Sequence, residues 1–235
     1  KTKETRQVLQ NKKSVFEKDK FMMKTKKWTY YYRNNLHKFC EDYLNINYLK
    51  LFQIILLTMM DFSNHFMFIA SRDLGKTFLV ALYCVCRCVL YPGTKIIVAS
   101  GNLNQAKEII GKIEKEFIPK SPLLNMEIKK INTTGSPYVL FGNGSFIEAV
   151  ASNQGARSRR AHIIIVDEFR LVPKDIIEMV LKRFIASERT PGFMSTPEYK
   201  NEKEKYVERN KEFYMTSAWF KNHWSWISLL SYAKN

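Results

Sequence analysis

Apolar positions along the chain change their spacing several times, and each change marks a different kind of element. Four short apolar runs predict buried strands: "HFMFIA" (65–70), "TKIIVAS" (94–100), "HIIIVDEF" (162–169) and "EFYMTSAW" (212–219). The third run is continuous, as in strands that are covered on both faces of a parallel sheet. "YVLFGNGSFIEAVAS" (138–152) has a Gly-Asn-Gly turn between two alternating runs, which predicts a hairpin.

Helical spacing separates these strands. The predicted helices are "YLKLFQIILLTMM" (48–60), Lys76 to about Leu90, "NLNQAKEIIGKIEKEF" (102–117) and "PKDIIEMVLKRFIA" (173–186). Ser100 and Asn102 can cap the third helix, and Pro173 suits the start of the fourth. Because strands alternate with helices, the pattern predicts a three-layer α/β domain with a mainly parallel sheet.

The first segment of the chain differs in composition. Residues 1–28 carry ten Lys/Arg against three acidic residues and show little apolar periodicity. This composition predicts a basic arm over residues 1–27 that is partly helical or mobile. Aromatic residues become dense from Trp28, so we expect ordered packing to begin there and the domain to span residues 28–235.

The charge of the chain points to a polyanionic partner. There are 38 Lys+Arg against 22 Asp+Glu, a formal charge of +16. Nucleic acid is the first candidate and an anionic membrane surface the second, while a generally basic, soluble surface is the plain alternative. No apolar run reaches the ~18 residues of a membrane span. We therefore expect no membrane partner.

The cysteines and histidines give no metal-binding pattern. Cys84, Cys86 and Cys88 alternate along a predicted helix, so Cys84 and Cys88 share a face while Cys86 points elsewhere. This spacing favours core packing over metal or redox chemistry, and free buried thiols suit a reducing cytoplasm. The four histidines also lack ligand spacing.

The segment "FIASRDLGKTFLV" (68–80) carries the first chemical signal. It ends a predicted strand and opens a predicted helix, the context of a phosphate-binding P-loop. Backbone N–H groups and the helix dipole would hold the phosphates, with Lys76 on the β- and γ-phosphates and the Thr77 hydroxyl on Mg²⁺. Ala70 stands where the pattern usually has its first glycine, and Asp73 lies inside an anion-binding loop.

The run "IIIVDEF" carries the second signal. Its apolar strand brings Asp167 and Glu168 to the carboxyl edge of the sheet, where ligands of open α/β sheets bind. Asp167 would hold the Mg²⁺ shell, and Glu168 would orient or deprotonate the attacking water. An acidic cap on a strand end is the plain alternative. Together the two signals predict an enzyme that hydrolyses ATP, with Mg²⁺ as cofactor.

These segments resemble the ATPase domain of tailed-phage terminase large subunits. The resemblance runs from about Trp28 to Trp226, keeps the order and spacing of the motifs, and leaves residues 1–27 outside. It implies an additional-strand, RecA-like P-loop fold with an N-terminal helical segment. The loop form "SRxLGKT", with its first glycine replaced, is typical of that family. Asp73 departs from the family pattern, so a reduced nucleotide affinity is expected.

The resemblance also assigns roles to individual residues. Gln53 matches the glutamine that reads adenine, and Arg72 matches the P-loop arginine that contacts phosphate; an ordinary surface glutamine and a solvated arginine are the alternatives. Arg157 in "GARSRRAH" is our choice for a finger acting on a neighbouring subunit, with Arg159 and Arg160 as rivals and DNA contact as an equal alternative. The implied nucleotide-binding residues are Gln53, Ser71, Arg72, Asp73, Leu74, Gly75, Lys76 and Thr77.

A hydroxyl pair at the end of a buried strand couples hydrolysis to motion in that family. Two pairs qualify by composition, Ser195-Thr196 and Thr216-Ser217. The segment Thr190-Pro191-Gly192 leaves little room for a strand before Ser195, which narrowly favours Thr216 and Ser217.

The resemblance finally implies a biological role. The chain would be the motor that drives double-stranded DNA into a procapsid, as a homo-oligomeric ring with a portal protein and a small terminase subunit as partners. It would act in the host cytoplasm and transiently at the portal. No strand-borne carboxylates remain after Asp167 and Glu168, so we expect no nuclease activity in this fragment. The alternatives are a helicase-like ATPase and a nucleic-acid-binding module with a degenerate P-loop.

Overall fold

The computed structural model describes residues 3–71, 74–152, 159–179, 181–185, 187–195, 201, 207–218, 220–221 and 223–234. Within these ranges it describes the side chains of all residues except 3–16, 193, 195 and 232–234. The helices are α1 (Lys3–Asn34), α2 (Leu36–Asp42), α3 (Leu51–Phe62), α4 (Lys76–Leu90), α5 (Leu103–Lys112), α6 (Ile118–Lys120), α7 (Pro122–Glu127), α8 (Lys174–Met179) and α10 (Trp224–Lys234). None of these helices is long and apolar enough to cross a membrane.

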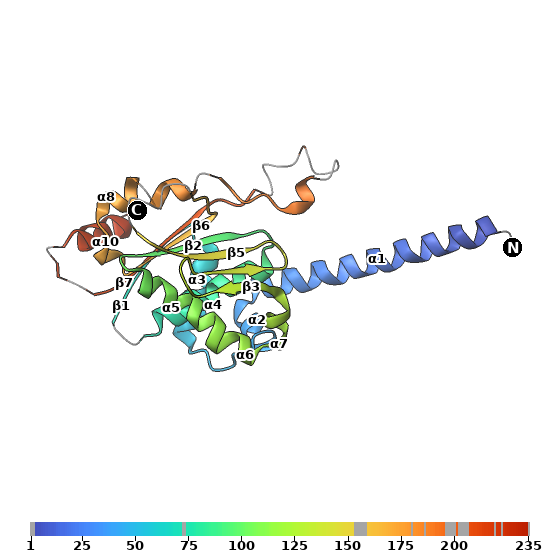
Figure 1. Cartoon of the computed structure of the whole chain (residues 1–235), viewed down its shortest axis with the longest axis horizontal. Helices are drawn as coiled ribbons and strands as arrows, with labels where there is room; N and C mark the ends of the chain where they lie inside the picture. Colours follow the sequence, from blue (N-terminus) through green and yellow to red (C-terminus); the bar gives the residue numbers. More distant parts are fainter. Residues whose placement is uncertain are drawn as a thin grey trace.

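The strands form one sheet of seven in the order β1-β7-β6-β2-β5-β4-β3 (Figure 1). They are β1 (His65–Ala70), β2 (Lys95–Ser100), β3 (Ile128–Asn132), β4 (Tyr138–Phe141), β5 (Phe146–Ala151), β6 (Ile163–Asp167) and β7 (Lys211–Ser217). The first five strands in this order are parallel, whereas β4 and β3 are antiparallel to their neighbours. The predicted mainly parallel sheet, the four predicted strands and the hairpin are therefore confirmed. Burial is confirmed for β2, β6 and β7, whereas β1 lies at the edge of the sheet and only its Phe66 and Ala70 are buried.

Side chains of each central strand alternate between two hydrophobic cores. In β6, Ile163 and Ile165 face the core that α4 and α5 cover, while Ile164 and Val166 face the core on the other side. Phe169, Ile177 and Phe184, from the segments that follow β6, close this second core. Because helices cover both faces of the sheet, the predicted three-layer α/β architecture is confirmed.

The buried helix α4 contains three of the four cysteines. Cys84, Cys86 and Cys88 are at most 1% exposed, and Cys40 of α2 is fully buried beside Cys86, with the two sulfur atoms 3.7 Å apart. Burial raises the pKa of the Cys84, Cys86 and Cys88 thiols above the usual range. All four cysteines are free thiols. The prediction of core packing is confirmed.

Several boundaries differ from the sequence prediction. Helix α1 runs from Lys3, so the arm is helical over a longer stretch than its composition indicates; Lys, Glu and Gln are good helix formers, and no Gly or Pro interrupts the segment. Residues 17–27 are exposed, and the start of ordered packing at Trp28 stays a prediction. It projects from the domain as one long helix (Figure 1). The expected α5 helix continues as a π-helical turn, Ile113–Phe117. Asn102 caps α5 as predicted, whereas the Ser100 hydroxyl instead donates to Gln105 Oε1.

The segment after β6 is less regular than its periodicity predicts. Among the described residues of the predicted helix 173–186, Lys174–Met179 is α-helical, directly after Pro173, and Leu181–Ile185 is a 3-10 helix. Strand β3 was not expected, because "IKKIN" is short and contains two lysines. It joins the sheet as the antiparallel neighbour of the hairpin strand β4.

Candidate nucleotide site

The loop between β1 and α4 has the backbone that phosphate binding requires. Gly75 adopts a left-handed conformation with φ 75°, which a side chain would strain, and α4 begins at the next residue, Lys76. The N–H groups of the first helical turn therefore point from α4 toward the end of the sheet, where an anion can accept them. Ser71 and Leu74 precede this turn and Thr77 lies within it, while Arg72 and Asp73 lie outside the described residues.

Gln53 reaches this loop from α3. Its Oε1 accepts the N–H of Lys50 over 3.0 Å, and this contact orients the amide. Its Nε2 lies so close to Gly75 that a Cβ added to the glycine would be 3.3 Å away. The structure thus brings the predicted adenine-reading residue to the predicted phosphate loop, across more than 20 positions of sequence.

Asp167 and Glu168 lie at the carboxyl edge of the same sheet. Asp167 ends β6 and is 5% exposed, and its Oδ1 accepts the N–H of Glu168 over 3.0 Å. Burial, followed by the negative charge of Glu168, raises the pKa of Asp167 to about 6. Glu168 follows with a positive φ of 47°.

Glu168 is held by groups from three other places in the chain. Its Oε1 lies 3.5 Å from Lys76 Nζ and accepts the Ser217 hydroxyl over 2.8 Å. Its Oε2 accepts the Thr216 hydroxyl over 3.1 Å, the Ser217 N–H over 3.2 Å and Arg170 Nε over 3.0 Å. Burial opposes ionisation of this carboxylate, but the Ser217 and Arg170 hydrogen bonds and the charge of Lys76 prevail and lower its pKa to about 2.

The hydroxyl pair Thr216-Ser217 ends β7, between β1 and β6. The Ser217 hydroxyl is central because it accepts a hydrogen bond from Lys76 Nζ over 3.0 Å while donating to Glu168. Ser195, in contrast, belongs to the 3-10 helix Gly192–Ser195, and Thr196 lies outside the described residues. The geometry supports the choice of Thr216 and Ser217, whose coupling role stays a prediction.

Arg170 was missed by sequence reasoning. It lies in the 3-10 helix Phe169–Leu171, and its side chain is only 9% exposed beside Glu168. Its one sequence signal is its position two residues after the predicted catalytic glutamate.

Two of the three candidates for the arginine finger lie among the described residues. Arg157 lies outside the described residues. Of its rivals, Arg159 pairs with Glu148 of β5 over 2.9 Å, and Arg160 is exposed. The structure therefore leaves the choice among the three as a prediction.

The residues at the edge of the sheet suit a magnesium ion that accompanies a nucleotide. Asp167 is a buried carboxylate beside a second negative charge, and a divalent cation would relieve that repulsion. Mg²⁺ is usually bound through one or two protein oxygens and the phosphates of the substrate. Thr77 and Asp167 fit that donor set. Among the described residues there is no group of three or more His, Cys, Asp or Glu that could hold a metal ion.

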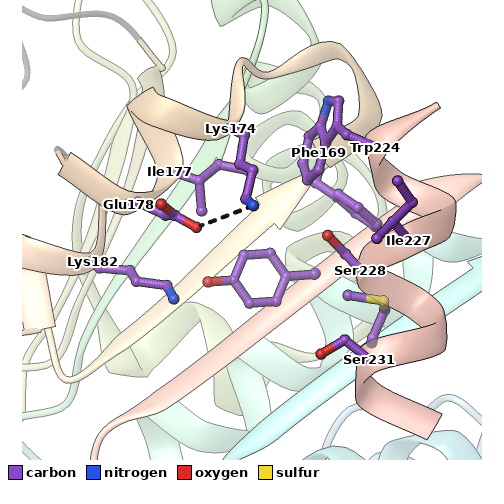
Figure 2. Close-up of a pocket in the computed structure, with 11 residues that line it drawn as sticks. Phe169, Lys174, Ile177, Glu178, Lys182, Trp224, Ile227, Ser228 and Ser231 are labelled. Atoms are coloured by element: carbon purple, nitrogen blue, oxygen red, sulfur yellow. Dashed lines mark ion pairs between the residues drawn. The ribbon is translucent and has the colours of Figure 1, made fainter. Parts of the chain in front are cut away.

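A separate cavity of about 400 Å³ lies between α8 and α10, on the face of the sheet opposite α4 and α5 (Figure 2). Phe169, Ile177 and Trp224 contribute apolar walls, and Lys174 pairs with Glu178 at the rim. No predicted nucleotide-binding or catalytic residue lines it. The glycine loop and the network around Glu168 are the better candidate for a nucleotide site, since they combine an anion-binding backbone with the buried carboxylate of Asp167 and the partly buried carboxylate of Glu168.

Comparison with solved structures shows the same fold. The large terminase of bacteriophage HK97 matches with a TM-score of 0.58 and 15% identity over 80% of this chain and 37% of that chain. A mutant ATPase domain of the Thermus phage P74-26 large terminase matches at 0.51, with 11% identity over 75% of this chain and 67% of that chain. A large terminase from a thermophilic bacteriophage, in complex with ADP, matches at 0.50, with 12% identity over 78% and 42%. No curated protein sequence matches the chain.

Family membership follows from the sequence. The model of the family "Terminase large subunit, T4likevirus-type, N-terminal" matches residues 67–210, well over half of the chain. That range includes the P-loop and the Asp167-Glu168 pair, whereas Gln53, Thr216 and Ser217 lie outside it. The chain therefore belongs to the terminase large-subunit family of the T4-like virus type, of which the match covers the N-terminal region.

Proposed function

We propose that this chain hydrolyses ATP where β1, β6 and β7 end, and that it is the motor domain that moves double-stranded DNA into a viral procapsid. The observation that carries the proposal is the placement of Lys76 Nζ 3.0 Å from Ser217 Oγ and 3.5 Å from Glu168 Oε1. These contacts join the phosphate loop, the acidic strand end and the hydroxyl pair. Family membership and the ADP-bound relative support the assignment.

The proposed chemistry follows from the contacts that Lys76 and Glu168 would exchange when ATP binds. Lys76 would leave Ser217 and Glu168 for the β- and γ-phosphates, whose oxygens carry more negative charge than a hydroxyl. Glu168 would then lose a stabilising positive charge, so its pKa would rise from about 2 and the carboxylate would become a better proton acceptor. The attacking water would give its proton to Glu168 while its oxygen bonds to the γ-phosphorus and the bond to the ADP oxygen breaks. Mg²⁺, held by Thr77 and Asp167, would neutralise charge on the phosphates.

Family membership and charge support the finer functional assignments, which we propose here. The +16 charge suits binding to DNA phosphates, which is independent of base sequence. We propose a homo-oligomeric ring with a portal protein and a small terminase subunit as partners, acting in the host cytoplasm and at the procapsid portal. Arg157 remains our choice for the finger that acts on a neighbour's nucleotide.

Two substitutions test the assignment. Lys76→Ala should abolish ATP binding in a titration with a fluorescent nucleotide, because the charged phosphate partner is removed. Glu168→Ala should retain binding but lower turnover by about 10²-fold or more, as expected when a catalytic base is absent. Lys174→Ala, an exposed lysine on α8, is the control and should behave as the parent chain. Near-parental turnover of the Glu168 variant, with and without DNA, would place the base elsewhere.

A further inference from the structure

A second cavity, which we call the α1 cavity, lies between the base of α1 and the body of the domain and has a volume of about 530 Å³. Helix α1 contributes Thr25, Trp28, Thr29 and Arg33, which follow the helical repeat and therefore share one face. The body contributes Arg189 and the C-terminal end of α4. Because α4 has 15 residues, this end lies about 20 Å from the nucleotide loop, and the α1 cavity is separate from the proposed ATP site.

Three guanidinium groups gather around the Tyr91 ring beside the α1 cavity. The Cζ atoms of Arg87, Arg33 and Arg189 lie 3.4, 4.0 and 5.7 Å from the centre of this ring. Arg87 and Arg189 share the carboxylate of Glu208. Arg33 has no carboxylate partner among the described residues, and its Nε and Nη2 donate instead to a backbone carbonyl of α4.

This cluster carries more positive than negative charge. Lys211 and Asp61 complete it, so that in the described part of the chain three arginines and a lysine face two carboxylates. Burial lowers the pKa of Arg33 and Arg189, because their surroundings do not fully replace water. A guanidinium nevertheless stays charged in proteins, so the cluster retains a positive charge that a bound anion would balance.

The donors that remain in the α1 cavity suit a phosphate group. Within the described residues, Arg33 Nη1 and the Thr29 hydroxyl have no hydrogen-bond partner, and guanidinium and hydroxyl groups are ordinary phosphate ligands. Glu127 is the one acid in the described lining, where two arginines outnumber it, and its Oε1 already accepts the Tyr43 hydroxyl over 3.1 Å. The DNA backbone is the phosphate source that fits, because α1 brings the ten Lys/Arg of residues 1–28 to this place.

We propose that the α1 cavity binds a backbone phosphate of double-stranded DNA at the base of α1. Arg33 and Thr29 would donate to the phosphate oxygens, and Arg189 would add positive charge from the body of the domain. Helix α1 extends away from this cavity (Figure 1), so a duplex that lies along the helix reaches the cavity where the helix joins the body. This inference rests on the proposed function for the choice of DNA as substrate, but it does not require ATP hydrolysis.

Two matched substitutions in the full chain test the site. Thr29→Glu and Tyr30→Glu each add one negative charge to adjacent positions of α1, but Thr29 lines the cavity whereas Tyr30 is 74% exposed and does not. In titrations with a duplex of fixed length, Thr29→Glu should weaken binding about tenfold more than Tyr30→Glu, because it also removes a charge-assisted phosphate contact. Glu127→Gln keeps the acceptor for Tyr43 but removes the negative charge from the lining, so it should bind the duplex more tightly than the parent chain.

Equal duplex affinities for Thr29→Glu and Tyr30→Glu would overturn the proposal, and so would a Glu127→Gln chain that binds DNA no better than the parent. Inorganic phosphate distinguishes the two sources of the anion. If it raises the thermal unfolding midpoint of the parent but not of Thr29→Glu, while the duplex affinities of the two glutamate variants are equal, the cavity binds free phosphate and not DNA. The difference between these variants should persist in a Lys76→Ala background without nucleotide, so the result does not depend on whether the chain hydrolyses ATP.

Discussion

Arg170 donates from Nε to Glu168 Oε2 over 3.0 Å, and its buried guanidinium fixes one oxygen of the proposed base. The other oxygen is shared between Ser217 and Lys76. When Lys76 moves to a phosphate, Arg170 and β7 are the contacts that still define where the carboxylate points. At the scale of single residues, Arg170 is therefore a positioning residue for the water that Glu168 would activate.

Arg170→Met removes the donor and retains an unbranched side chain. We expect turnover to fall by about tenfold to 10²-fold with little change in ATP affinity, because a misplaced base affects the reaction more than binding. The measurement is steady-state ATP hydrolysis together with nucleotide titration. Arg183→Met, at an exposed arginine, is the control, and Arg170→Lys should recover part of the activity. Parental turnover in Arg170→Met would mean that β7 alone positions Glu168.

At the scale of elements, the start of β6 is joined to β2 through His162. Its Nδ1 accepts the N–H of Lys95 over 3.1 Å, and its backbone N–H donates to the Lys95 carbonyl. Burial, followed by the positive charges of Lys95, Arg189 and Arg87, lowers the pKa of His162 to about 4 from 6.5. The ring is thus neutral in the folded protein, with its acceptor nitrogen committed to β2.

This pairing predicts a pH-dependent contribution to stability. Between pH 6.5 and about 4 the unfolded chain binds a proton at His162 that the folded chain does not, so stability is lost as the pH falls through that window. His162→Asn keeps an acceptor without the titration and should show a shallower loss in urea unfolding across those pH values. His65→Asn, the same change at an imidazole that is 62% exposed, is the control. Identical slopes for parent and His162→Asn would contradict the assignment.

The elements also show what the sequence could and could not predict. Strands β2, β6 and β7 are apolar enough to be recognised alone, because helices bury them on both faces. Strand β1 lies at the edge of the sheet and is recognised by its apolar run alone. Strand β3 has two lysines and is ordered by its pairing with β4, which is a tertiary contact that no local pattern contains. The P-loop and Asp167-Glu168 were visible as motifs of adjacent residues. Arg170 could not be predicted in this way, because its contact with Glu168 depends on where its side chain points. The residue spacing after Glu168 does not indicate that direction.

At the scale of the whole molecule, α1 extends the basic charge away from the domain (Figure 1). Its base is fixed to the body by Arg33, whose Nε and Nη2 donate to the Leu90 carbonyl over 3.0 and 2.6 Å. The Arg33 guanidinium also stacks 4.0 Å from the centre of the Tyr91 ring. These anchors lie beyond residue 27, so the basic arm of residues 1–27 can be removed without disturbing them.

Deleting residues 1–27 should weaken binding to double-stranded DNA and flatten its salt dependence. The segment carries ten Lys/Arg, and the slope of log affinity against log salt falls by about 0.9 for every phosphate that is no longer neutralised. Binding titrations at several salt concentrations measure this slope. ATP affinity and the unfolding midpoint should be unchanged, which serves as the internal control. An unaltered slope would show that the phosphates are bound by the domain itself.

The left-handed backbone of Glu168 has a consequence for how this protein balances activity against stability. A non-glycine residue at φ 47° is strained by about 1 kcal/mol or more, and the chain retains that strain at the position of its proposed base. Glu168→Gly and Glu168→Ala both remove the carboxylate, but glycine alone also relieves the strain. In urea unfolding the glycine variant should be the more stable of the two by about 1 kcal/mol, the reverse of the usual order in helices and strands. Equal stabilities would mean that the loop relaxes once the side chain is gone, and that the carboxylate contacts, more than the chain path, impose this conformation.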